Sequence, residues 1–81
     1  MSFMIEVLYR SPRDLDRERI ISDIVAESEG RLDYFEATDT PGVSETITLT
    51  FVFDREEQAE IAASKLQTGG YHVEGVCDYG E

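Results

Sequence analysis

Four stretches of the chain alternate between apolar and polar side chains with the period of two that is typical of β-strands. In residues 45–53 every second side chain is a bulky hydrophobe, and most of the residues between are threonine. Residues 3–9 are apolar on most of both faces, which is typical of a central strand. Residues 31–38 alternate weakly and are more polar, which favours an edge position. Residues 71–78 complete the set of four predicted strands.

Between the first two strands the pattern changes to the 3.6-residue period of an amphipathic helix. Its expected apolar stripe consists of Leu15, Ile20, Ile21, Ile24 and Val25. Ser11 is the predicted N-cap, followed by Pro12 at the first helical position, although Asp14 or Asp16 is an alternative cap. Gly30 is expected to end this helix in the left-handed conformation.

A second helical pattern follows the threonine-rich strand. Asp54, with Glu57 three residues later, is the predicted capping pair. The expected sheet-facing stripe is Ala59, Ala62, Ala63 and Leu66, in which the small alanines allow a close approach to the sheet. Gly69 and Gly70 end this helix, and residues 39–42 are a predicted turn between the second and third strands.

The predicted order, β-α-β-β-α-β, indicates the α+β class and a ferredoxin-like plait. In this fold two helices cover one face of a four-stranded antiparallel sheet, and the strands at 3–9 and 45–53 lie side by side in its middle. The threonines between the hydrophobes of the third strand predict that the other sheet face is open or weakly covered. Because 81 residues are too few for two cores, we expect a single domain over residues 1–81.

The composition narrows the range of partners. The chain has 7 basic and 18 acidic residues and a formal charge of −11, which disfavours nucleic acids and anionic membranes as partners. No apolar run approaches a membrane span, and MSFMIEVLYR lacks the features of a signal peptide, so we expect a cytoplasmic protein. The one cysteine, Cys77, excludes an intrachain disulfide. Since so small a domain is often stabilised by a partner subunit, we expect a homodimer.

Several kinds of chemistry are missing from the sequence. One cysteine is too few for an iron–sulfur cluster, and no glycine-rich phosphate loop precedes either helix. We therefore expect neither an enzyme nor a cofactor or metal. Alternation places His72 on one strand face with Glu74 and Asp78, where it is either a general base or metal ligand, or a solvated surface residue. Cys77 alternates with Val73 and is predicted to be a small buried packing residue.

The basic residues are concentrated in one segment. Residues 10–19 (RSPRDLDRER) have a formal charge of +1, whereas the rest of the chain has −12. Arg10 and Arg13 flank the end of the first strand and the start of the first helix, where a carboxylate or phosphate could dock. Alternatively, the arginines of this segment pair with neighbouring acids on the helix surface.

The chain resembles the ACT domain, a small regulatory plait, most closely over residues 46–76 (TITLTFVFDREEQAEIAASKLQTGGYHVEGV). A strand, an Asp-capped helix, a glycine turn and a Y-x-V strand follow one another there as ACT sequences place them. The resemblance implies a free-standing regulatory module that forms dimers and binds a free amino acid near the loop after the first strand. The implied ligand-binding residues are Arg10, Ser11, Pro12 and Arg13, in a loop without the glycine that ACT domains usually carry there.

A second interpretation belongs to a different class of function. The chain is then an acidic protein-interaction module without a small-molecule ligand, and its open sheet face or an edge strand meets another protein. The acidic surface would direct it to a basic partner. Stabilisation of the fold by a ligand distinguishes the first interpretation from the second.

Overall fold

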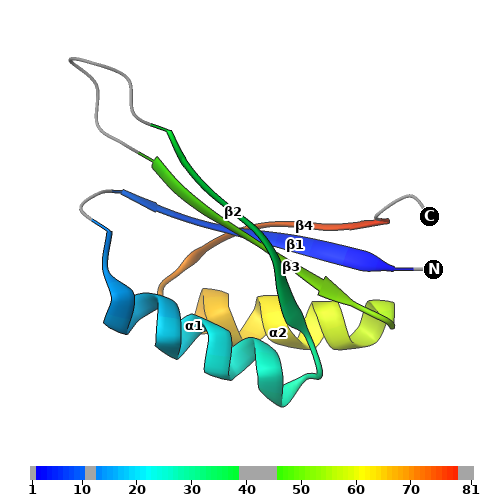
Figure 1. Ribbon diagram of the computed structural model, residues 1–81. Helices are drawn as coiled ribbons and strands as arrows, with labels where there is room; N and C mark the ends of the chain where they lie inside the picture. Colours follow the sequence, from blue (N-terminus) through cyan, green and yellow to red (C-terminus); the bar gives the residue numbers. More distant parts are fainter. Residues whose placement is uncertain (1, 11–12, 39–45, 79–81) are drawn as a thin grey trace.

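The computed structural model describes residues 2–10, 13–38 and 46–78 of the chain. Its elements are β1 (Phe3–Arg10), α1 (Leu15–Glu27), β2 (Arg31–Thr38), β3 (Thr46–Phe53), α2 (Glu56–Thr68) and β4 (His72–Asp78). The four strands form one antiparallel sheet in the order β2-β3-β1-β4, and both helices lie against the same face of it (Figure 1). The predicted ferredoxin-like plait is thus confirmed, with β1 and β3 in the centre. The predicted turn at 39–42 lies outside the described residues.

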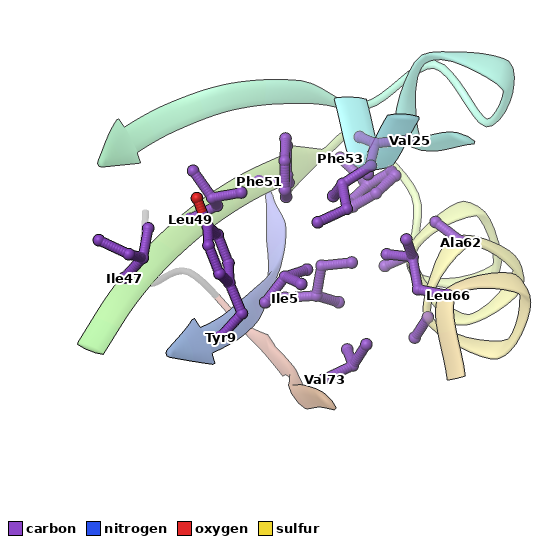
Figure 2. Packing of buried hydrophobic residues seen from close by; sticks show 14 residues of the cluster. Ile5, Tyr9, Val25, Ile47, Leu49, Phe51, Phe53, Ala62, Leu66 and Val73 are labelled. Carbon is purple, nitrogen blue, oxygen red and sulfur yellow. The ribbon is translucent and has the colours of Figure 1, made fainter. Parts of the chain in front are cut away.

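The core lies between the sheet and the two helices. β1 and β3 pair over their whole length, from Phe3 opposite Phe53 to Arg10 opposite Thr46. Antiparallel partners share a face of the sheet, so the hydrophobes predicted for the two strands gather on the helix side. Figure 2 shows these side chains packed together with Val25 of α1 and with residues of α2. No helix of the described residues is long and apolar enough to cross a membrane.

The two helices bury different kinds of residue. In α2 the predicted stripe is confirmed, because Ala59, Ala62, Ala63 and Leu66 are its buried residues. In α1 the buried residues are Ile21 and Val25. The predicted stripe was too wide, since Leu15 is 67% exposed and Ile20 is 49% exposed. Positions i and i+4 face the sheet in this helix, whereas Leu15 and Ile20 lie at the side of that narrow seam.

In both helices the observed N-cap differs from the residue that the sequence predicted first. The N-cap of α1 is Asp14, the alternative left open by the sequence, and its Oδ1 accepts a hydrogen bond of 3.0 Å from the backbone N–H of Arg17. Asp54 does not cap α2: the N-cap is Arg55, which makes no capping bond with its side chain. Asp54 is exposed and lies 3.7 Å from Arg31, the first residue of β2.

The end of α1 also departs from the prediction. Glu29, and not Gly30, occupies the left-handed region, with a φ of 65°. Gly30 is needed for a different reason, namely space. A Cβ atom at this position would lie 2.4 Å from Phe53 Cε2 and 2.6 Å from Val25 Cγ1. The prediction was wrong because it explained Gly30 by its backbone conformation. The glycine is required here because side chains of the core occupy the space that a Cβ atom would need.

A β-bulge in β4 changes which side chains face the core. Gly75 has a φ of 101°, and the register between β1 and β4 shifts between Met4 and Glu6. As a result Glu74 is opposite Glu6, and Cys77 is opposite Met4. Both pairs lie on the sheet face that points away from the helices. One extra residue in a strand reverses the alternation beyond it.

Two predictions fail at this bulge. Cys77 is exposed and is not a buried packing residue. Val76 instead turns toward the core and packs against it. The predicted common face of His72, Glu74 and Asp78 ends at Glu74, because Asp78 is opposite the core-facing Phe3.

Candidate functional site

Two adjoining hollows open at the end of the sheet where β1 ends and β4 begins. The first has a volume of about 340 Å³ and is lined by Leu8, Tyr9, Arg17, Tyr71, His72 and the Gly69–Gly70 turn. The second, of about 450 Å³, is lined by Leu8, Tyr9, Arg10, Thr46 and His72. Because they share three lining residues, we treat them as one site and call it the end pocket.

The turn after α2 positions one wall of the end pocket. The backbone N–H groups of Gly69, Gly70 and Tyr71 each donate a 3.0 Å hydrogen bond to a carbonyl of the last turn of α2. Gly70 has a φ of 92°, a conformation that glycine adopts without steric cost. The chain thereby reverses direction and enters β4 with His72 directly opposite Leu8 of β1.

Tyr9 lines both hollows and is only 8% exposed. Its hydroxyl accepts a 2.9 Å hydrogen bond from the backbone N–H of Asp14 and donates a 2.7 Å bond to Glu18 Oε2. Burial raises the pKa of the Tyr9 hydroxyl above its usual value of 10.0, and the bond to Glu18 raises it further. Tyr9 therefore stays neutral and joins the end of β1 to the first turns of α1.

Glu18 also holds Arg13. The guanidinium of Arg13 contacts both carboxylate oxygens, with Nε at 2.9 Å and Nη2 at 3.1 Å. The hydrogen bond from Arg13 is the main cause that keeps the pKa of Glu18 below its usual value. The same guanidinium lies over the ring of Phe35 in β2, 4.1 Å from its centroid, a cation–π contact. Arg13 thus connects α1 to β2.

The four residues predicted to bind a ligand have different places in the structure. Arg10 is exposed and lines the second hollow. Arg13 lines neither hollow, since it is engaged by Glu18 and Phe35. Ser11 and Pro12 lie outside the described residues. The structure brings Arg10 together with His72, which the sequence had left between a functional and a surface role.

Arg17 lines the first hollow, although the sequence indicated only surface pairing for it. Its guanidinium lies over the ring of Tyr9, with 5.2 Å between Cζ and the centroid. The N-cap of α1 is the sequence signal that could have identified Arg17 as a pocket residue. With the helix starting after Asp14, Arg17 lies in the first turn, beside the end of β1.

Arg10 and Arg17 differ from several other basic residues in their pairing. Arg13, Arg31 and Lys65 each form an ion pair with a carboxylate. Arg10 and Arg17 form none with any of the described residues, in a chain with 18 acidic groups. Two guanidinium groups with unused donors therefore lie in the walls of the end pocket.

His72 stands at the mouth of the end pocket and contacts one acid. Its Nε2 lies 3.2 Å from Glu74 Oε2, and both side chains are more than half exposed. Across the described ranges, no group of three or more His, Cys, Asp or Glu side chains is placed to hold a metal ion.

Comparison with known proteins gives similarity in structure alone, since no protein-family model and no curated protein matches the chain. A de novo designed protein, Foldit4, is 15% identical with a TM-score of 0.62, over 91% of this chain and 92% of that chain. The regulatory subunit of aspartate kinase from Thermus thermophilus, in its ligand-free form, is 14% identical with a TM-score of 0.58. That match covers 90% of this chain and 48% of the subunit, so the chain spans about half of its length.

These likenesses support the fold that the sequence predicts. At 14% and 15% identity, both similarities concern the fold alone. Since one of the two similar structures is a de novo designed protein, the fold by itself does not imply a function. Any function must therefore be argued from the residues of the end pocket.

Proposed function

We propose that this chain is a regulatory module, not an enzyme, that binds a free amino acid in the end pocket. The observation that carries the proposal is the presence of two guanidinium groups without carboxylate partners among the described residues, Arg17 in the lining of the first hollow and Arg10 in that of the adjoining second hollow. In a chain with a net charge of −11, these groups create a local preference for an anion.

The chemistry of the end pocket suits an amino acid. A guanidinium binds a carboxylate through two parallel hydrogen bonds, which fixes the orientation of the ligand. Leu8 and Tyr71 supply apolar surface for a side chain. Glu74 lines neither hollow, but it contacts His72, which lines both, and so brings a negative charge near the pocket, as an ammonium group would require. The volume of the first hollow is near the lower end of the range for ligand sites, as a small ligand requires.

The position of the end pocket suits regulation. The lining of the first hollow comes from β1, α1, β4 and the turn that ends α2, so a ligand bound there would contact all four segments at once. A ligand that joins separate elements stabilises the arrangement in which they fit it and thereby shifts the population toward that arrangement. The ACT-like fold is in keeping with such a role.

A thermal-unfolding screen of the purified chain against the free amino acids tests this proposal. An amino acid at 100 times its dissociation constant stabilises the fold by about 2.7 kcal/mol, which raises the melting temperature of so small a domain by roughly 15 °C. We expect one amino acid, or a small group of similar ones, to give this shift. The corresponding amide, which lacks the carboxylate, should not.

Two variants locate the site. Arg17→Ala should abolish the shift, whereas Arg19→Ala should retain it. Arg19 is a matched control because it lies in the same helix, has the same charge and lines neither hollow. A screen in which no amino acid raises the melting temperature, or a shift that survives Arg17→Ala, would refute the proposed function.

A further inference from the structure

The sheet face opposite the helices is covered by no described element (Figure 1). We call it the open face and define it by Met4, Glu6, Leu8 and Arg10 of β1 and by the residues that pair with them. Its outer strands contribute Arg31, Tyr34 and Glu36 from β2, and His72, Glu74 and Cys77 from β4. The second hollow of the end pocket opens at one end of it.

The open face is more apolar than the surface of an acidic chain would suggest. Met4 and Leu8 are half-buried side chains in its centre, and Val52 beside them is 3% exposed. Tyr34 on the neighbouring strand is 57% exposed, so most of a large aromatic side chain meets water. Aromatic side chains with a polar end are enriched at protein interfaces.

The acidic excess of the chain is almost absent from the open face. Its charged residues are two arginines and three glutamates, which give −1 when His72 is neutral. The rest of the chain therefore carries −10 of the total of −11. Two copies can approach through their open faces while most of their like charge stays outside the contact.

The open face also contains an unfavourable pair that a second copy would relieve. Glu6 and Glu74 are directly opposite each other on neighbouring strands, and like charges in such positions repel. Glu74 contacts His72, but Glu6 has no ion pair among the described residues. A hydroxyl donor placed over Glu6 would reduce the cost of this arrangement.

We propose that two copies of this chain associate through their open faces, related by a two-fold axis parallel to the strands. Such an axis places β1 of one copy over β3 of the other, and β2 over β4. Glu6 then meets Thr50 of the other copy, and Glu74 meets Tyr34, because these four residues form one row across the sheet. Each glutamate of the repelling pair gains a hydroxyl donor.

The next row across the sheet shows the same complementarity. It runs from Glu36 through Thr48 and Leu8 to His72. The two-fold axis brings Glu36 of one copy over His72 of the other, and this contact occurs twice in the dimer. A carboxylate over an imidazole is favourable, because a ring N–H can donate a hydrogen bond to a carboxylate oxygen.

The size of the open face sets the strength of this association. Four strands about 4.8 Å apart, three of eight residues and one of seven, cover roughly 500 Å² on each copy, or about 1,000 Å² in total. This is near the smallest area of a specific interface. We therefore expect a dimer that forms reversibly and depends on protein concentration.

Sedimentation equilibrium of the full chain without ligand tests the dimer. With rising concentration the mass should increase from 9.2 kDa toward twice that value. Added salt should favour the dimer, because it screens the repulsion between two negatively charged copies. A chain that stays at 9.2 kDa at all concentrations would overturn the proposal, as would a dimer that salt dissociates.

Two matched variants identify the face. Tyr34→Glu places a further charge on the open face and should weaken the dimer at least tenfold. Ile61→Glu makes the same kind of change at a residue of α2 that is 48% exposed and should leave the dimer intact. Circular dichroism confirms that both variants are folded. If Ile61→Glu dissociates the dimer and Tyr34→Glu does not, the interface lies on the helices and the proposal is wrong.

The outcome does not depend on the proposed amino-acid ligand, because the experiment contains none. A dimer without any ligand response would leave this proposal standing and refute the ligand. A ligand response in a strictly monomeric chain would do the opposite.

Discussion

At the scale of single residues, the hydroxyl of Tyr9 and the carboxylate of Glu18 join three elements. Tyr9 belongs to β1, Glu18 to α1, and Arg13, which Glu18 binds, lies over Phe35 of β2. The hydroxyl of Tyr9 both donates and accepts, so neither of its functions is left unsatisfied in a buried position. This network fixes how α1 begins beside the end pocket.

Glu18→Gln should weaken the dependence of the unfolding free energy on pH in the acid range. The folded state holds the pKa of Glu18 below its usual value of 4.5, so ionised Glu18 stabilises the fold at pH values above the usual pKa. That contribution is lost as the pH falls through the lowered pKa. The original chain should therefore exceed Glu18→Gln in unfolding free energy at neutral pH, and the two should converge in acid.

Urea unfolding of both proteins, from about pH 7 down to about pH 3, measures this difference. Glu60→Gln is the control, because Glu60 is an exposed residue of α2 that lies beyond the first turn. Its unfolding free energy should differ little from that of the original chain at any pH. A gap between Glu18→Gln and the original chain that stays constant throughout would contradict the assignment.

At the scale of elements, the start of α1 and the start of α2 are built differently. Asp14 satisfies a free N–H group of α1 with its side chain, whereas no side chain does so at Arg55, the N-cap of α2. Both helices have acidic residues in the first turn, where they interact favourably with the helix dipole. α2 relies more on its buried alanines and Leu66 than on its cap.

Asp14→Ala and Asp54→Ala should therefore differ in stability. Asp14→Ala removes a capping hydrogen bond and should lower the unfolding free energy by about 1 kcal/mol. Asp54→Ala removes only an exposed ion pair of 3.7 Å and should change it by less than about 0.5 kcal/mol. Urea unfolding of the two variants measures the difference. Equal losses would mean that Asp54 caps α2 after all.

At the scale of the whole molecule, the net charge of −11 opposes compactness. Like charges repel one another more strongly in the folded chain than in the unfolded one, and salt screens that repulsion. The melting temperature at neutral pH should therefore rise with sodium chloride. Near the sequence pI of about 4.3 the net charge vanishes, and the effect of salt should largely disappear. Thermal unfolding at two salt concentrations and both pH values measures this.

The element order of the molecule could be predicted because it depends on hydrophobic periodicity, which is visible in the sequence. The Phe51 and Phe53 positions of β3 and the Ala62 and Leu66 positions of α2 follow from spacing alone. The caps could not be fixed, since Asp14, Asp16 and Ser11 have similar capping propensity and the choice depends on how α1 meets Tyr9.

The end pocket was predictable only in part. The role of Arg10 in the pocket follows from its place at the end of β1. Arg17 and His72 reach the pocket only after α1 and β4 have packed against the rest of the chain. The position of Cys77 was not predictable, because the bulge at Gly75 depends on a close backbone approach to Met4. Such contacts between distant segments have no local signature in the sequence.

The bulge in β4 also makes the chain convenient to label. By turning Cys77 outward, it places the one thiol of the chain on the open face, opposite Met4. A fluorophore or spin label attached there needs no engineered cysteine. Energy transfer or dipolar coupling between two labelled copies would then report the distance between their sheets directly.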